Sequence, residues 1–325
     1  MMPYVYRADT ALARPVPKPA DSGLLKVSGG HSIWWEETGP SDGVPVLVVH
    51  GGPGGYIKPY YRRLLDPARH RGLFFDQRGC GRSEPAGTFA GNTTADLISD
   101  IEALRVARGV DRWIVMGGSW GSTLALAYAQ AHPDRVAALL VSGVFLARQE
   151  DQDWWWRGVE SVFPDVVEAR DSLLSAEEKS DPRAAFLKRV LDPDPEIHRP
   201  AAAVLGAAEG QTLDLWPSAP PEDPEFVTDA EVVSMRLFAH YDVNDYFLAE
   251  NQLLSDAHRL AGVPGAIVAG RSDMCTPPKG AWDLSKAWPE GRLTIVAAAG
   301  HRWNDEILGR VVVSELARLT DHVLR

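Results

Sequence analysis

A serine set among glycines is the residue of this sequence with the clearest chemical potential. Residues 117–121 read Gly-Gly-Ser-Trp-Gly, which places Ser119 at the centre of a G-x-S-x-G pattern. The pattern follows an apolar run at 113–116 that suits a buried strand, and it precedes a segment with helical spacing. Glycine is needed on both sides because so tight a strand-to-helix turn leaves no room for side chains. The pattern therefore predicts that Ser119 is a nucleophile at a positive helix N-terminus rather than an incidental serine in a glycine-rich turn.

A serine hydroxyl is a weak nucleophile until a base removes its proton, and an acid must fix the tautomer of that base. Asp273 follows an apolar run at 265–269, and His301 follows another at 293–297. Both belong on loops at the carboxyl ends of strands, where α/β sheets bind ligands. We expect His301 to be the base and Asp273 to orient it, although an aspartate there could also be a turn residue. The other histidines have ordinary core, surface or loop positions.

A glycine-rich segment, His-Gly-Gly-Pro-Gly-Gly at 50–55, follows the apolar run at 44–49. It lacks the terminal Gly-Lys-Ser/Thr of a phosphate-binding loop. Glycines in this position allow a backbone N–H to point at a developing oxyanion. We predict an oxyanion hole made by the N–H groups of Gly52 and Trp120, with Gly51 as the next candidate for the first donor.

The chain offers no group of His, Cys and carboxylate residues with metal-ligand spacing, so we predict neither a metal nor another cofactor. Asp-Gln-Arg-Gly-Cys-Gly-Arg-Ser at 76–83 has charges that would brace the site by ion pairing. Cys275 lies two residues after Asp273, where a thiol reagent could block the pocket without the cysteine being a nucleophile.

Strands and helices alternate around these loops. The segments 24–28 and 32–37 suggest a hairpin, and threonines at 93 and 94 can cap a helix that ends at Gly109. This alternation predicts an α/β fold with a mostly parallel sheet and helices on both faces. Six buried strands are expected near residues 44–49, 73–75, 113–116, 138–141, 265–269 and 293–297.

The alternation stops after about residue 146 and resumes at 263. The intervening sequence has helical spacing and two proline-rich connectors, at 192–195 and 217–224. Because Ser119 precedes this insertion and Asp273 and His301 follow it, one catalytic core is split by a cap. We predict core at 1–147, a helical cap at 148–250 and the rest of the core at 251–325.

Composition excludes several classes of partner. The 325 residues carry a net charge of -11, which argues against extended contact with nucleic acid or anionic membranes. No apolar run reaches the length of a membrane span, and residues 1–7 lack the layout of a secretory signal. Two cysteines are too few for a disulfide framework. We expect a cytoplasmic protein with no obligate protein partner.

Taken together, the segments 50–55, 76–83, 117–130, 270–273 and 300–301 resemble the proline iminopeptidases of the α/β-hydrolase fold. The resemblance runs over nearly the whole chain and implies release of an N-terminal residue, typically proline, without a cofactor. It also implies a triad of Ser119, Asp273 and His301. In that family, cap carboxylates hold the free amino terminus of the substrate, and Glu209 in Glu209-Gly210 matches one of them.

The second family carboxylate precedes His-Tyr-Phe, and here the sequence departs from the pattern. Phe238 occupies the glutamate position and Asp242 the phenylalanine position, four residues apart and hence on one face of a helix. In one interpretation, which we favour, Asp242 restores the anion from one turn away. In the other, one of the two carboxylates that bind the amine is lost, and Phe238 makes the pocket suit an apolar acyl group.

These residues leave three functions to weigh. The first is a serine aminopeptidase acting on a small peptide or aminoacyl-amide, with an aminoacylated metabolite as a specialised amide substrate. The second is a carboxylesterase or lactonase that has lost amine recognition. The third is a non-catalytic binding protein, against which the complete set of catalytic residues argues.

Overall fold

One eight-stranded sheet forms the centre of the molecule, with strand order β1-β2-β4-β3-β5-β6-β7-β8. The computed structural model describes residues 15–213 and 227–325. β1 and β2 form the expected antiparallel hairpin, β2 is antiparallel to β4, and all further pairs are parallel. The strands are β1 Asp21–Lys26, β2 Ser32–Thr38, β3 Val44–Val49, β4 His70–Phe75, β5 Trp113–Gly118, β6 Val136–Ser142, β7 Gly265–Gly270 and β8 Gly291–Val296.

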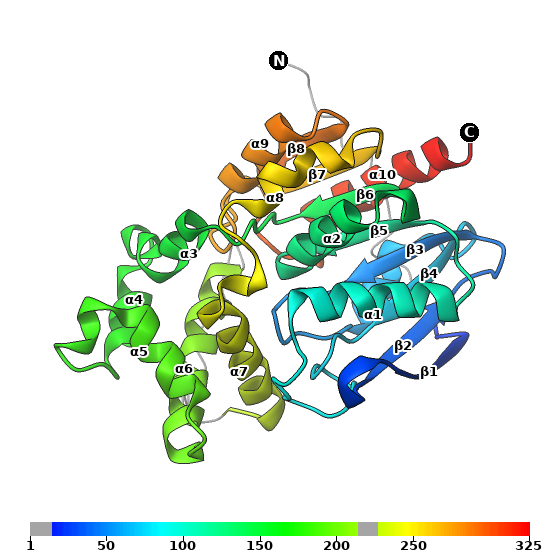
Figure 1. The fold of residues 1–325 in the computed structure, drawn as a ribbon. Coiled ribbons are helices and arrows are strands. Elements are labelled where there is room, and N and C mark those ends of the chain that lie inside the picture. The colour runs from blue at the N-terminus through cyan, green and yellow to red at the C-terminus, as the bar shows by residue number, and fades with distance from the viewer. Residues whose placement is uncertain (1–14, 214–226) are drawn as a thin grey trace.

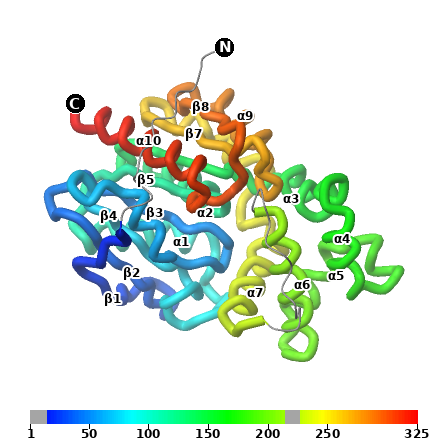
Figure 2. Tube along the Cα trace, turned by 180° about the vertical axis from the view of Figure 1, so that it is seen from behind, coloured from blue at the N-terminus to red at the C-terminus, as the bar shows by residue number. Residues whose placement is uncertain are grey.

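The sheet is covered on both faces, as the continuous apolar strands predict. Alternate residues of each strand point to opposite sides, so Val115 and Ile267 pack in one core while Ile114 and Val268 pack in the other. Figures 1 and 2 show α1 and α2 over one face and α10 over the other. The helices of the core are α1 Thr94–Ala107, α2 Trp120–Ala131, α8 Gln252–Ser255, α9 Pro278–Ala287 and α10 Glu306–Val323.

Local sequence explains where these elements begin. The Thr93 hydroxyl accepts from the Asp96 N–H, and the Asp96 carboxylate accepts from the Thr93 N–H, which forms a capping box on α1. The strand β4 begins at His70, before its apolar run. The His70 ring is buried against the Thr320 hydroxyl at 2.9 Å, so a polar residue is satisfied inside the strand.

A helical segment between β6 and β7 packs around its own apolar cluster and lies beside the sheet (Figure 1). Its helices are α3 Gln149–Trp156, α4 Pro164–Asp171, α5 Pro182–Leu191, α6 Pro195–Leu213 and α7 Asp229–Val243. The proline-rich residues 192–195 connect α5 to α6, as expected, whereas the connector at 217–224 lies outside the described residues. We propose the division into core at 1–147, cap at 148–250 and core at 251–325 on this basis.

Over residues 15–213 and 227–325, no helix combines the length and the apolar character that crossing a bilayer requires.

Candidate active site

Ser119 lies in a strained turn between β5 and α2. Its φ of 58° and ψ of -134° fall in a region that side chains rarely adopt. A Cβ on Gly117 would lie 2.0 Å from the Gly121 carbonyl oxygen, and one on Gly121 would lie 2.3 Å from the Val49 oxygen. Glycine is therefore obligatory at both positions, and the turn holds the serine at the carboxyl end of the sheet.

Asp273 and His301 come together on the loops that follow β7 and β8. The His301 Nδ1 lies 2.8 Å from the Asp273 Oδ2. Asp273 is 1% exposed, and it accepts further hydrogen bonds from the Thr276 N–H and hydroxyl, both at 2.8 Å. Burial by itself would lower the pKa of His301, but the charges of Asp273 and Glu209 outweigh it and hold that pKa above its ordinary value. This arrangement can orient an imidazole and stabilise its charged form.

The end of β6 joins the serine turn to His301. The Ser119 N–H donates to the Ser142 carbonyl oxygen at 3.0 Å. The next residue, Gly143, has φ 53°, and a Cβ there would lie 3.0 Å from the His301 Cε1. Sequence reasoning missed Gly143, although a glycine directly after a strand was the available signal.

The predicted oxyanion donors face the same space. Gly52 has φ 128°, and Trp120 is the first residue of α2. In the described part of the chain, neither N–H is used in a hydrogen bond. Gly51, the neighbouring candidate, stays the alternative for the first donor. We propose that both free N–H groups can receive an oxyanion.

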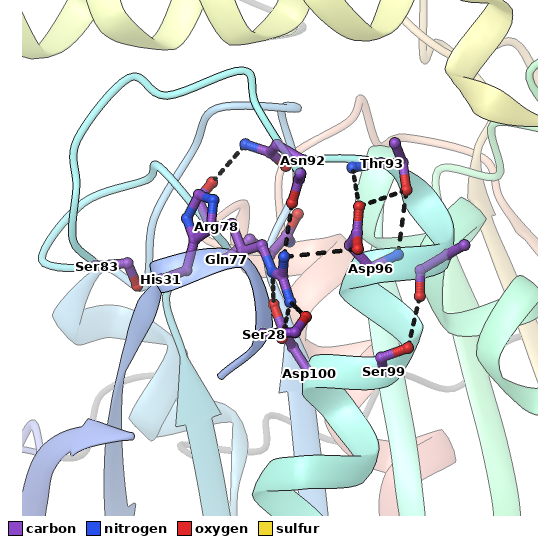
Figure 3. Close-up of polar contacts among 12 residues, drawn as sticks. Ser28, His31, Gln77, Arg78, Ser83, Asn92, Thr93, Asp96, Ser99 and Asp100 are labelled. Carbon is purple, nitrogen blue, oxygen red and sulfur yellow. Dashed lines mark hydrogen bonds and ion pairs between the residues drawn. The ribbon is translucent and has the colours of Figure 1, made fainter. Parts of the chain in front are cut away.

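Charges of the loop after β4 brace these glycines, as the sequence suggested. The Asp76 carboxylate accepts from the Ile57 N–H at 2.8 Å and from the Arg82 Nε at 2.7 Å. Arg78 forms a buried pair with Asp100 through two bonds of 2.5 and 2.7 Å (Figure 3). The Asn92 side chain donates to the Arg78 carbonyl oxygen at 3.1 Å, which ties the next loop to this one (Figure 3).

A cavity of about 40 Å³ lies between these loops and the cap. It has room for about three water molecules, so a small acyl group fits best beside Ser119. Gln152, Trp155 and Tyr246 from the cap and Thr276 from the core also line it. Sequence reasoning missed Gln152 and Thr276 as lining residues. The predicted site residues in its wall are Gly52, Ser119, Trp120, Glu209, Phe238 and Asp242.

Among the described residues, no group of three or more His, Cys, Asp or Glu side chains could hold a metal ion. Cys275 also lines the cavity, and burial raises the pKa of its thiol well above the ordinary value. A neutral thiol is a poor nucleophile, which agrees with the expectation that Cys275 is not one.

Comparison with known proteins identifies the family. The α/β-hydrolase fold family matches residues 44–304. A proline iminopeptidase of Xylella fastidiosa (strain Temecula1 / ATCC 700964) is 42% identical over 294 residues, covering 88% of this chain and 92% of that protein. One from Neisseria meningitidis serogroup A is 38% identical over 312 residues, covering 95% and 99%. The chain belongs to the proline iminopeptidase family.

Solved structures share the fold of this proline iminopeptidase family member. Proline iminopeptidase of Mycobacterium smegmatis superimposes with a TM-score of 0.60 at 19% identity, covering 94% of this chain and 99% of that one. A carboxylesterase structure from Nitrososphaera gargenis gives 0.64 at 17%, covering 92% and 100%. At these identities the likeness shows the fold alone.

Glu209 lies at the end of α6, which docks on the loop that carries His301. The His301 N–H donates to the Leu213 carbonyl oxygen at 3.3 Å. Burial raises the pKa of Glu209, against the opposing charges of His301, Arg302 and Lys58. Within the described residues no hydrogen bond reaches its carboxylate, and the residue is only partly buried, so the carboxylate faces the cavity rather than a protein partner.

Asp242, the carboxylate that departs from the family pattern, already has a counter-ion. Its Oδ1 lies 2.7 Å from the Arg183 Nε, and its Oδ2 accepts from Trp156 and Tyr246, both at 3.2 Å. This pairing argues against the interpretation in which Asp242 by itself replaces the missing glutamate. Phe238 is packed against Trp155, with 5.5 Å between the ring centroids, and gives that side of the cavity an apolar wall.

Proposed function

We propose that this proline iminopeptidase family member is a serine aminopeptidase that releases N-terminal proline, or another small residue, from a peptide or amide. The observation that carries the proposal is the unpaired Glu209 carboxylate in the same cavity as Ser119. A carboxylate that faces a narrow cavity and accepts no hydrogen bond from the protein attracts a cation, and the free amino terminus of a peptide supplies one. The relatives named above, both proline iminopeptidases, support the same activity.

The reaction we propose uses three side chains. Ser119 attacks the acyl carbon while His301 takes its proton, and Asp273 stabilises the imidazolium that forms. The N–H groups of Gly52 and Trp120 stabilise the oxyanion. His301 then protonates the leaving amine, and water hydrolyses the acyl-enzyme through the same base. The proposal requires no cofactor.

The alternatives have less support. An amide hydrolase for an aminoacylated metabolite would use the same groups, but no observation distinguishes its acceptor. An esterase or lactonase would have no substrate group to pair with the Glu209 carboxylate in the cavity. The cytoplasmic location and the absence of an obligate protein partner stay predictions from the sequence.

A substrate panel tests the proposal. We expect turnover of prolyl and alanyl arylamides, with loss of activity when the amine is acetylated and with Ser119→Ala. A serine-directed phosphonate should label the native protein and leave Ser119→Ala unlabelled. Equal turnover of free and N-acetylated substrates would favour the esterase instead, and failure to label would favour a binding protein.

A further inference from the structure

Gln152 presents a buried amide that the proposed reaction does not use. The residue lies on α3, is 3% exposed and lines the cavity that holds Ser119. Its Oε1 has no hydrogen-bond partner among the described residues. Unpaired buried polar atoms are rare in folded proteins because each one forfeits its bonds to water. An acceptor kept in this state inside an active-site cavity indicates that a ligand completes it.

The other polar side chains of the cavity's cap wall narrow the choice of ligand. Asp151 is bound by Arg148 through bonds of 2.9 and 3.1 Å, and Asp242 is bound by Arg183. Their charges are already compensated. Among the described acidic and amide side chains that line the cavity, Gln152 has a buried acceptor oxygen without a partner, and the partly exposed Glu209 carboxylate also accepts no hydrogen bond. A ligand that satisfies both must carry at least two N–H or O–H donors and positive charge.

A protonated secondary amine such as an N-terminal proline carries two N–H donors, and a primary ammonium carries three. We infer that Gln152 determines specificity by accepting one hydrogen bond from the substrate's ammonium, while Glu209 supplies the charge. This inference rests on the proposed aminopeptidase function and adds a residue that the sequence did not reveal. It also explains how Phe238 can replace the glutamate of the family pattern. The Gln152 amide oxygen on α3 would accept from the second N–H of the substrate's ammonium in place of that glutamate.

Steady-state kinetics with Gln152→Met test the assignment, because methionine keeps the size and removes the acceptor. We expect KM for prolyl arylamide to rise roughly tenfold or more, as for loss of a hydrogen bond to a charged group. Turnover of an uncharged acyl ester should not change. Gln152→Glu retains an acceptor and should keep KM at or below the native value. Gln149→Met, an exposed change on the same helix, is the matched control.

The kinetic results distinguish the role of Gln152 from the proposed aminopeptidase function. Native KM for prolyl arylamide in Gln152→Met would overturn the inference and leave the aminopeptidase standing. A parallel loss of ester and arylamide turnover would also overturn it, because Gln152 would then act only on the fold. Failure of the native protein to hydrolyse any aminoacyl arylamide would overturn the proposed function and this inference together.

Discussion

Glu209 contributes, after Asp273, to the electrostatic environment of His301. Its negative charge adds to that of Asp273 and favours the imidazolium, while Arg302 opposes both. A base with a raised pKa stays protonated to higher pH, and only its neutral form can take a proton from Ser119. We therefore expect the acidic limb of activity to lie above the ordinary histidine pKa of 6.5.

We expect Glu209→Gln to move that limb to lower pH. The substitution removes one charge that favours the imidazolium, so the pKa of His301 falls and the neutral base persists into more acidic solution. The measurement is the pH profile of kcat/KM on an uncharged ester, which avoids any effect on amine binding. Glu196→Gln, an exposed change on the same helix, should leave the profile in place. An unshifted acidic limb in Glu209→Gln would show that Glu209 does not influence the pKa of His301.

Asp242 should matter more for stability than for the amine. Removing one partner of a buried ion pair costs about 3–5 kcal/mol, and we expect nearer 2 kcal/mol for Asp242→Asn because Arg183 is 24% exposed. KM for prolyl arylamide should change less than about twofold, since the lost charge was already compensated. Thermal unfolding and kinetics measure the two effects.

The control for Asp242 is Asp245→Asn. Asp245 is the other, exposed carboxylate of Arg183, so its loss should change neither stability nor KM appreciably. A large rise in KM at full stability in Asp242→Asn would instead support Asp242 as a ligand of the substrate's amine.

The loops at the ends of β6, β7 and β8 act as one element that holds His301. Asp273 and Thr276 fix its Nδ1 side, and Gly143 supplies a flat backbone surface against the ring. The positive φ of Gly143 makes this surface specific to glycine.

Gly143→Ala should therefore lose activity beyond its effect on stability. The left-handed backbone costs about 1–2 kcal/mol with alanine, and the new Cβ would in addition press on His301. Gly109→Ala is the matched control, because Gly109 has φ 63° and nothing within 4 Å of an added Cβ. Both variants should melt at similarly lowered temperatures, and only Gly143→Ala should lose kcat. Equal kcat in the two would contradict this role for Gly143.

At the scale of the whole molecule, the cap is bonded directly to the catalytic loops. The Trp154 Nε1 on α3 donates to the Met274 carbonyl oxygen at 2.8 Å, and the Tyr241 hydroxyl on α7 donates to Asn92 at 2.8 Å. Figure 1 shows α7 as the cap helix that runs beside the core. Because these bonds meet the loops that carry the site, cap position and site geometry are coupled.

Tyr241→Phe tests that coupling. The change leaves the buried Asn92 oxygen unpaired, at a cost of about 1–3 kcal/mol. We expect faster amide hydrogen exchange along α7 and unchanged exchange in β5 and β6. Tyr128→Phe removes a buried hydroxyl bond within the core and should leave α7 unaffected. Exchange that increases equally in α7 and the sheet would show that the cap does not move as a separate unit.

Much of the architecture could be predicted because it depends on local rules. Glycines flanking Ser119, the capping threonine at 93 and the continuous apolar strands each act over a few residues, so the sheet and the helical insertion followed from them. The expected pairing of Asp273 with His301 was also accessible, since parallel strands bring their carboxyl ends to one edge of the sheet. Most strand limits differed by one to three residues, and β4 shows one reason: its polar first residue, His70, is satisfied by Thr320 far along the chain.

What the sequence determined by itself is thus the chemistry: a serine turn, an acid–base pair and glycines for an oxyanion, each encoded by residue type and short-range spacing. The tertiary structure alone decided which polar groups of the cap are free to bind. Asp242 and Glu209 are the same kind of group in the sequence, yet Arg183 neutralises the first and no described residue bonds to the second. Pairing depends on contacts between helices distant in the chain, and that is why Gln152 became visible only in the folded molecule.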